Sequence, residues 1–91
     1  MFVFRSKNFD KSLNKVLASG KVTLQEIEKV IDMFINEKKL PPKYRDHALT
    51  GDWKGYRECH IQGDLLLIYR IENDQLVLVL VDIGSHSQLF G

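Results

Sequence analysis

The side chains best suited to proton transfer are concentrated in the second half of this 91-residue chain. All three histidines lie there, as His47, His60 and His86, and the carboxylates Glu58 and Asp64 stand within a few residues of His60. Histidine takes up and releases protons near neutral pH, and a neighbouring carboxylate can fix which ring nitrogen carries the proton. This group of residues therefore favours general acid–base chemistry.

Cleavage of RNA without a metal ion is one reaction that fits these residue types. It requires a base for the ribose 2′-hydroxyl, an acid for the departing 5′-oxygen, and cationic groups around the phosphate. Lys54 and Arg57 precede Glu58 in the sequence and are candidates for the phosphate contacts. The residue types alone leave this reaction as one possibility among several.

Other kinds of site are less well supported. Zinc sites usually contain a close ligand pair such as Cys-x-x-Cys, and the sequence has none, which disfavours a metal centre built from the three histidines. Glycine-rich phosphate loops and serine-nucleophile motifs are also absent from the sequence. Cys59 is expected on a buried face, where thiols are usually inert. Each polar residue also has a purely structural interpretation, since Asp64, for example, is a common turn former.

Composition predicts one globular domain over residues 1–91. Apolar residues make up 44% of the chain and charged residues 27%, as in ordinary soluble domains. The net charge is only +1, yet residues 1–57 hold 12 basic and 7 acidic side chains, whereas residues 58–91 hold one and five. Such segregation indicates an anionic partner for the first part of the chain.

We expect a cytoplasmic protein. A single cysteine cannot form an internal disulfide, and the first residues lack the apolar run of a signal peptide. The longest apolar stretch, Leu76 to Val81, is far shorter than the ~20 residues needed to cross a bilayer. No membrane association is therefore predicted.

Two helices are predicted after a short first strand at residues 2–4. In residues 8–20, apolar side chains recur at helical spacing, and Gly20 supplies a left-handed cap. The second helix begins at a capping box formed by Thr23 and Glu26, and it carries a broad apolar stripe. Pro41 and Pro42 are predicted to end it, because proline lacks the amide proton and clashes with the preceding turn.

Three strands are predicted in the second half, at residues 56–62, 65–71 and 76–82, after a loop at 43–55. Turn residues separate them, so the strands should form an antiparallel meander, and the fold class is α+β with both helices on one face of the sheet. Alternation along the first of these strands turns Cys59 and Ile61 toward the helices, and turns Glu58 and His60 outward. The outward face is then free to form a site.

Residues 46–61, DHALTGDWKGYRECHI, combine motifs that occur together in one protein family. With Asp64, the triplet LIY at 67–69 and the segment GSHSQLF at 84–90, they resemble the YafQ branch of the RelE/ParE toxin superfamily. The match runs over residues 43–90 nearly without gaps, about half of the chain. For the fold, the resemblance implies two N-terminal helices on a twisted antiparallel sheet.

For function, the resemblance implies a type II toxin, a small ribosome-dependent endoribonuclease that cuts mRNA. The reaction would use no metal or cofactor and would leave a 2′,3′-cyclic phosphate. By analogy, His86 corresponds to the general acid, and His60 or His47, with Asp64, lies nearest the 2′-hydroxyl. Glu58 stands among these residues where relatives often carry aspartate. Phe90 would orient a base of the RNA, a role that aromatic rings fill well.

The implied partners are mRNA, the ribosome and a cognate antitoxin from the same operon, with operator DNA bound only through the antitoxin complex. Two alternatives stay open at this point. The superfamily also contains non-enzymatic toxins that inhibit a protein such as gyrase, and a catalytically inert member could be retained for binding its antitoxin. The three histidines and two carboxylates together favour the nuclease.

Overall fold

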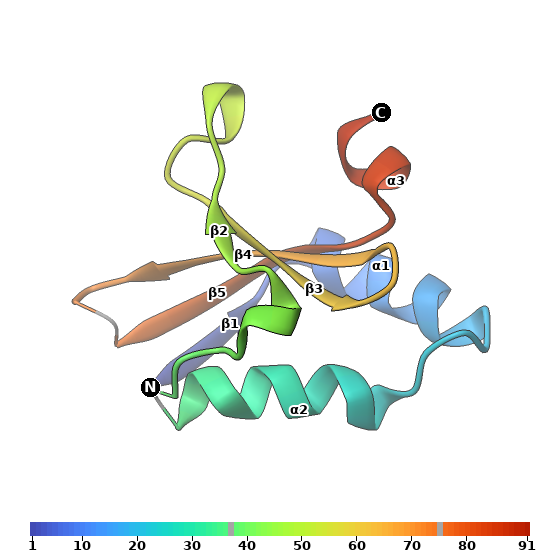
Figure 1. Ribbon diagram of the computed structural model, residues 1–91, viewed down its shortest axis with the longest axis horizontal. Helices are drawn as coiled ribbons and strands as arrows, with labels where there is room; N and C mark the ends of the chain where they lie inside the picture. The colour runs from blue at the N-terminus through green and yellow to red at the C-terminus, as the bar shows by residue number, and fades with distance from the viewer. Residues whose placement is uncertain (37, 75) are drawn as a thin grey trace.

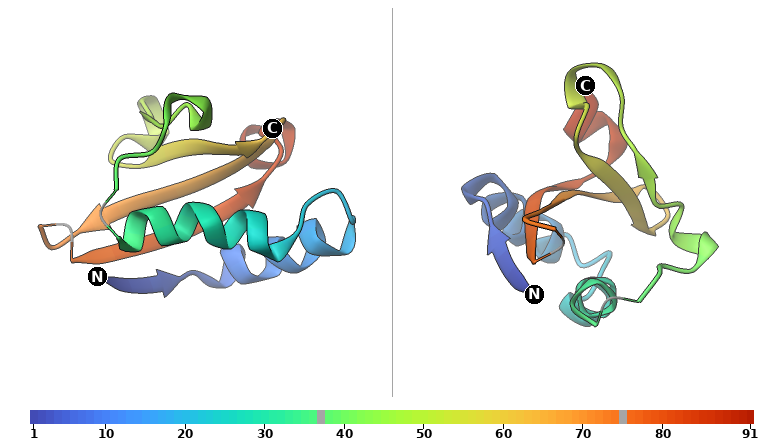
Figure 2. Two further views of the ribbon diagram at one scale, coloured as in Figure 1. Left: turned by 60° about the horizontal axis from the view of Figure 1, so that its bottom comes forward. Right: turned by 90° about the vertical axis from the view of Figure 1, so that its left-hand side faces the viewer.

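The computed structural model describes residues 1–36, 38–74 and 76–91. Its elements, with η marking 3₁₀ turns, are β1 (Phe2–Arg5), α1 (Lys7–Ala18), α2 (Leu24–Ile35), η1 (Pro42–Tyr44), β2 (His47–Ala48), η2 (Gly51–Trp53), β3 (Arg57–Gln62), β4 (Leu65–Glu72), β5 (Val77–Gly84) and α3 (His86–Phe90). The strands form one sheet in the order β1-β5-β4-β3-β2. Helices α1 and α2 both cover one face of this sheet, which confirms the α+β class (Figure 2).

Side-chain caps start both long helices; the cap at Thr23 is the predicted one, whereas α1 begins at Lys7 behind a cap at Ser6, one residue before the predicted start at residue 8. The Ser6 hydroxyl accepts a hydrogen bond from the Phe9 amide at 3.0 Å, and the Thr23 hydroxyl accepts one from the Glu26 amide at 3.3 Å. These bonds satisfy amide groups that have no partner within the helix. None of the helices in the described ranges is both long and apolar enough to cross a membrane.

The end of α2 differs from the prediction, because the helix stops at Ile35 and does not reach Pro41. The Asn36 side-chain amide donates to the carbonyl oxygen of Asp32 at 2.9 Å. The Asn36 backbone amide donates to the same carbonyl oxygen at 2.9 Å, and Asn36 is the C-cap residue of α2, five residues before Pro41. Pro42 instead begins the short η1 turn.

The sheet is mixed, whereas the sequence predicted an antiparallel one. Strands β3, β4 and β5 form the expected antiparallel meander. Strand β1, however, pairs in parallel with β5, with Phe2 opposite Val77. The chain between these two strands is long, so no hairpin turn sets their relative direction. Periodicity indicates that residues 2–4 are extended, but it carries no information about the edge that they join.

A bulge in β5 determines which of its residues face the helices. The register of β4 and β5 shifts between Ile68 and Tyr69, which leaves Val81 as an extra residue in β5. One extra residue reverses the alternation of a strand. Leu80 and Ile83 therefore both point into the core, although three positions separate them.

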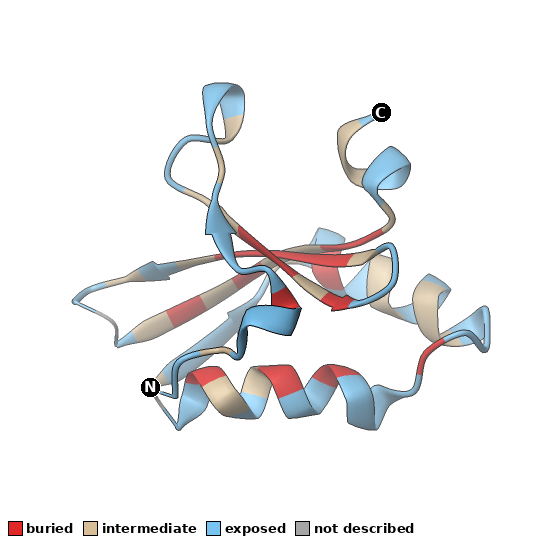
Figure 3. Cartoon of the chain, in the orientation of Figure 1, coloured by how far each residue is buried: buried red, intermediate tan, exposed pale blue. Residues whose placement is uncertain are grey.

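The core lies between the sheet and the two long helices (Figure 3). It is built from buried side chains of α1, the α1–α2 connection, α2, η1 and the three central strands: Phe9, Val22, Ile27, Val30, Phe34, Tyr44, Cys59, Ile61, Leu67, Tyr69, Leu78, Leu80 and Ile83. Burying this apolar surface is the main force that fixes the helices on the sheet.

Two short elements lie where the sequence suggested only loop and tail. Strand β2 pairs with β3, and α3 forms the end of the chain. The amide of Gln88 donates to the Ser85 hydroxyl at 3.2 Å, and the Ser85 amide donates to the Gln88 side chain at 2.8 Å. These two bonds form a capping box, and the spacing Ser85-x-x-Gln88 is a sequence signal that could have predicted α3.

The face of the sheet away from α1 and α2 carries an apolar floor between two raised segments. Leu66 and Ile68 point to this face and are fully buried. The segment 49–56 and helix α3 both rise from the same side of the sheet, on either side of the floor (Figure 1). We refer to this side as the open face, and the residues predicted to do chemistry lie along it.

Candidate active site

Glu58 is a nearly buried carboxylate in contact with two histidines. It lies on β3 opposite His47 of β2, and His60 follows two residues later on the same side of the strand. Its Oε1 atom is 3.6 Å from Nε2 of His47 and 3.5 Å from Nε2 of His60. The alternation predicted for β3 is correct, but Glu58 is only 5% exposed, because the pairing of β2 with β3 covers it. A carboxylate buried this far needs such partners.

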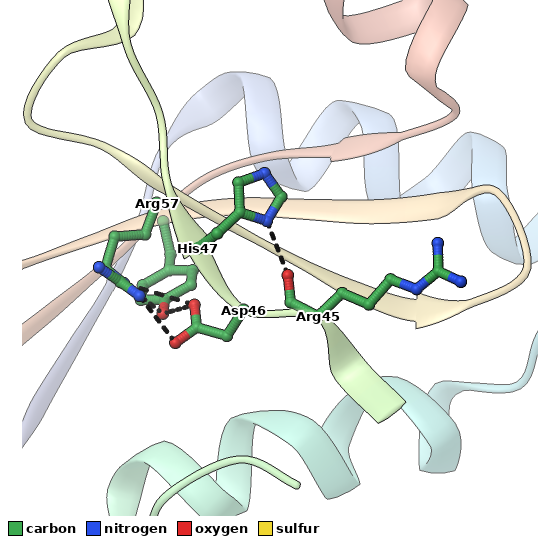
Figure 4. Close-up of polar contacts among 5 residues, drawn as sticks. Arg45, Asp46, His47 and Arg57 are labelled. Carbon is green, nitrogen blue, oxygen red and sulfur yellow. Dashed lines mark hydrogen bonds and ion pairs between the residues drawn. The ribbon is translucent and has the colours of Figure 1, made fainter. Parts of the chain in front are cut away.

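The two histidines differ in which ring nitrogens are free. Nδ1 of His47 lies 2.7 Å from the carbonyl oxygen of Arg45 (Figure 4). Its Nε2 lies on the other side of the ring, 3.6 Å from Oε1 of Glu58. Acceptor groups therefore flank both nitrogens of His47. His60 also turns Nε2 toward Glu58. In the tautomer that places the proton on Nε2, Nδ1 of His60 carries a lone pair that can accept a proton.

Asp64 connects the β3–β4 turn to the start of α3. Its Oδ1 atom accepts a hydrogen bond from the backbone amide of His86 at 3.4 Å. Gly84 lies just before this helix, and a Cβ atom on it would come within 2.9 Å of the Gln88 side chain. Asp64 and the close approach at Gly84 therefore set where α3, and with it His86, leaves the sheet.

Strand register places His60 and Gly84, two residues before His86, on the same side of the sheet. His60 pairs with Leu66 of β4, and Leu66 pairs with Gly84 of β5, two residues before His86. Neighbouring strands are ~4.8 Å apart, so the backbones of His60 and Gly84 are separated by roughly 10 Å. Helix α3, which begins two residues after Gly84, rises from this same side of the sheet (Figure 1).

Aromatic rings join the two raised segments of the open face. Trp53, in segment 49–56, meets Phe90 of α3 edge-on with 5.7 Å between ring centroids. Trp53 also contacts Tyr56 at 5.4 Å, and Phe90 contacts the ring of His86 at 5.1 Å. Phe90, for which the family resemblance implies a base-orienting role, is thus the ring that links His86 to Trp53.

Arg57 does not join this group, because it lies on the helix-facing side of β3. Its guanidinium contacts the Asp46 carboxylate at 3.1 Å and donates through Nε to the Tyr69 hydroxyl at 3.3 Å (Figure 4). The Tyr69 hydroxyl donates in turn to Asp46. The hydrogen bond to Asp46 raises the pKa of Arg57. Lys54, the other predicted phosphate contact, is exposed just after η2.

The chain as a whole, and not only the residues gathered here, matches one toxin family. The family model described as the bacterial toxin YafQ of type II toxin–antitoxin systems matches residues 2–91. The chain belongs to the YafQ family.

Known relatives of this YafQ-family chain share its length and fold. It is 39% identical over 69 residues to the mRNA interferase toxin YafQ of Escherichia coli K12, a match that covers 75% of this chain and 73% of the relative. A metal-bound toxin from Helicobacter pylori is 44% identical with a TM-score of 0.87, covering 99% of both chains. A chain of the E. coli DinJ–YafQ toxin–antitoxin complex is 31% identical with a TM-score of 0.83, covering 98% and 97%.

The metal carried by the H. pylori toxin belongs to that protein. In the described part of this YafQ-family chain, no three His, Cys, Asp or Glu side chains are arranged to hold a metal ion. Among the residues described above, His47, Glu58 and His60 come nearest to such a donor set.

Sequence reasoning assigned no role to Trp53, Tyr56 or Arg70, which also lie along the open face. Arg70 is the only basic residue after position 57. Its guanidinium pairs with Glu72 at 2.5 Å and lies 5.3 Å from the centre of the Tyr56 ring. The two-residue period of a strand could have predicted the position of Arg70. It follows Ile68 by two positions on β4 and so faces the same side of the sheet.

The partly buried hydrogen bond between Tyr69 and Asp46 should stabilise the fold of this YafQ-family chain. We expect Tyr69→Phe to lower the free energy of unfolding by about 1–3 kcal/mol, since Asp46 loses a donor and Tyr69 is buried. Urea denaturation followed by circular dichroism would measure the change. Tyr56→Phe is the matched control and should alter stability by less than about 0.5 kcal/mol. Equal destabilisation by both substitutions would contradict a special role for the Tyr69 hydroxyl.

The thiol of Cys59 should be unreactive in the folded chain. The side chain is fully buried, and burial, with smaller contributions from the charges of Asp46 and Glu58, raises its pKa to about 12. Thiolate is the reactive form, so a raised pKa leaves the thiol protonated and unreactive at pH 8. Iodoacetamide at that pH should modify the chain, as read by mass spectrometry, only after unfolding in urea. Rapid labelling of the folded protein would contradict this.

Proposed function

We propose that this chain is the toxin component of a type II toxin–antitoxin system and an endoribonuclease that cleaves mRNA by metal-free general acid–base transfer. The observation that carries the proposal is the arrangement of the open face. There Glu58 orients His60 on the sheet, while α3 carries His86 on the same side. One group is thus available to take a proton and another to supply one. Membership of a family whose E. coli member is named an mRNA interferase supports the same reaction.

His60 is the proposed general base. With Nε2–H directed at the Glu58 carboxylate, Nδ1 takes the proton of the ribose 2′-hydroxyl, and the 2′-oxygen attacks the adjacent phosphorus. Glu58 also stabilises the imidazolium that forms, as an anion held 3.5 Å from the ring. His47 is a weaker candidate for the base, because acceptor groups already flank both of its nitrogens.

His86 is the proposed general acid. As the bond between phosphorus and the 5′-oxygen breaks, His86 supplies the proton that the departing oxygen needs, and the products are a 2′,3′-cyclic phosphate and a free 5′-hydroxyl. Asp64 keeps the start of α3 in place through the His86 amide. Phe90 orients a base next to the scissile bond, and the exposed Lys54 contacts the phosphate backbone.

The proposed site of action is the ribosome, where mRNA is already held in place. A net charge of +1 suits an enzyme that does not need to bind free RNA tightly. The basic excess in residues 1–57 would face anionic partners, either ribosomal RNA and mRNA or an acidic antitoxin. An antitoxin partner is proposed by analogy with the DinJ–YafQ complex. It would be encoded in the same operon, and operator DNA would be bound only through the antitoxin complex.

Induced expression in a bacterium tests the proposed function. We expect growth arrest, cleavage of mRNA at sites that primer extension maps to translated regions, and cyclic phosphate ends. Co-expression of the small protein encoded beside it should restore growth and co-purify with the toxin. Growth arrest with intact mRNA and damaged DNA would instead favour a non-enzymatic toxin acting on a protein such as gyrase. A harmless protein that still binds its neighbour would favour the inert alternative.

A further inference from the structure

The position of α3 depends on contacts made outside the helix. Helix α3 has only five residues, whereas an isolated helix needs ~12–15 residues to be even marginally stable in water. Its capping box and the bond from Asp64 both hold its first turn. Its last turn is held by a different contact, the edge-on packing of Phe90 against Trp53. Trp53 therefore fixes the end of α3 that the caps do not reach.

The segment that carries Trp53 is held by its own backbone hydrogen bonds. The Leu49 amide donates to the Tyr56 carbonyl at 2.9 Å and closes the base of the segment. Within it, the Trp53 amide donates to the backbone carbonyl oxygen of Thr50 at 3.2 Å, and the Tyr56 amide donates to that of Trp53 at 3.0 Å. Contact with the Tyr56 ring also restrains the indole. The segment can therefore act as a fixed support for a neighbouring helix.

Phe90 contacts both Trp53 and His86, so its position connects the two residues. The two residues are four apart on α3, so their side chains lie on the same face of the helix. Their ring centroids are 5.1 Å apart, and the ring planes are tilted by 46°. Moving Phe90 would leave the His86 imidazole, which is otherwise exposed, without its neighbour on this face.

We propose that Trp53 is a positioning residue for the reaction, holding Phe90 and, through it, the imidazole of His86 over the open face. Trp53 itself does not touch the reacting atoms in this scheme. The consequence for catalysis rests on the proposed function, whereas the structural link from Trp53 to His86 does not. Misplacement of a catalytic group by about 1 Å can reduce a rate by ~100-fold, so losing the support should have a large effect.

Single-turnover cleavage of mRNA tests the catalytic part of this inference. We expect Trp53→Ala to lower the rate constant at saturating RNA by about 100-fold and to change the half-saturating RNA concentration by less than about threefold. Trp53→Phe keeps a ring edge against Phe90 and should restore the rate to within about threefold of the parent. Phe2→Ala is the control, because Phe2 is an exposed aromatic on edge strand β1. An unchanged rate for Trp53→Ala overturns the inference. A higher half-saturating concentration at an unchanged rate constant also overturns it, and would make Trp53 an RNA contact.

Nuclear magnetic resonance of the His86 ring tests the structural part without any activity. In the parent, the nearby Phe90 ring should shift the imidazole proton resonances away from those of an unstructured histidine. Trp53→Ala should remove most of this shift, and Trp53→Phe should keep it. If Trp53→Ala does not fold, Trp53→Leu, which retains apolar volume but has no ring, replaces it. A parent that cleaves no RNA would refute the proposed function and leave this test standing, while identical His86 resonances in all folded variants would refute the positioning role.

Discussion

Replacing His60 by alanine should slow single-turnover cleavage of mRNA by about 10²–10⁴-fold, the range expected for loss of a general base. His60 is the ring whose Nε2 faces Glu58 and whose Nδ1 is oriented toward the open face in the proposed mechanism. The loss should appear in the rate constant, with RNA affinity nearly unchanged, because the base acts in the transition state.

His47→Ala is the matched comparison for His60→Ala. Both rings lie within 3.6 Å of the same carboxylate, but the nitrogens of His47 are flanked by Glu58 and the Arg45 carbonyl. We therefore expect a loss of about tenfold or less for His47→Ala, in the range of residues that support a catalytic group. A larger loss for His47→Ala than for His60→Ala would reverse the assignment of the base. Full activity of His60→Ala would exclude His60 from proton transfer.

Replacing His86 by alanine should reduce the cleavage rate as much as replacing His60. A substrate with a better leaving group should restore the rate of the His86 variant. We expect His86→Ala to reduce cleavage by about 10²–10⁴-fold on ordinary RNA. A substrate with sulfur in place of the bridging 5′-oxygen at the cleavage site needs no protonation of the leaving group. On that substrate, His86→Ala should approach the parent rate, whereas His60→Ala should remain slow, since the base is still required.

Ser87→Ala controls for disturbance of α3 in the His86 experiment. Ser87 is an exposed neighbour of His86 on the same short helix, and its substitution should leave cleavage within about twofold of the parent. Comparable losses for Ser87→Ala and His86→Ala would indicate damage to the helix. A His86→Ala variant that stays slow on the sulfur-containing substrate would show that His86 does something other than protonate the leaving group.

Much of the fold follows from patterns within a few residues. The Thr23–Glu26 capping box and the apolar stripe behind it predict the start of α2 correctly, because a helix cap acts over only three positions. Strand alternation correctly separates Cys59 from Glu58, because it depends only on the two-residue period of a strand. The predicted end of α2 was wrong, because the helix ends at Ile35 and not at Pro41. Two consecutive prolines are a strong helix-ending signal, whereas Asn36, which caps the helix earlier, is a weak one.

Such short-range patterns could not predict the features that depend on pairing between distant segments. The parallel partnership of β1 with β5 joins the first residues to the last strand, and nothing in either segment specifies it. The bulge at Val81 changes the face of every later residue in β5, and Val81 itself is an ordinary strand residue. Strand β2, with two residues, is too short to show any period.

Patterns in the sequence indicate the α+β class, the face of the sheet that carries Glu58 and His60, and a set of residues specific enough to suggest the family. The surroundings of those residues are set by the folded chain. It buries Glu58 between two histidines, draws Arg57 to Asp46 on the other face, and links α3 to segment 49–56 through Trp53 and Phe90. The difference lies in how far apart along the chain the interacting residues are. Caps and periodicity arise from interactions between residues close in sequence, whereas the environment of a side chain depends on which strands become neighbours and in what register.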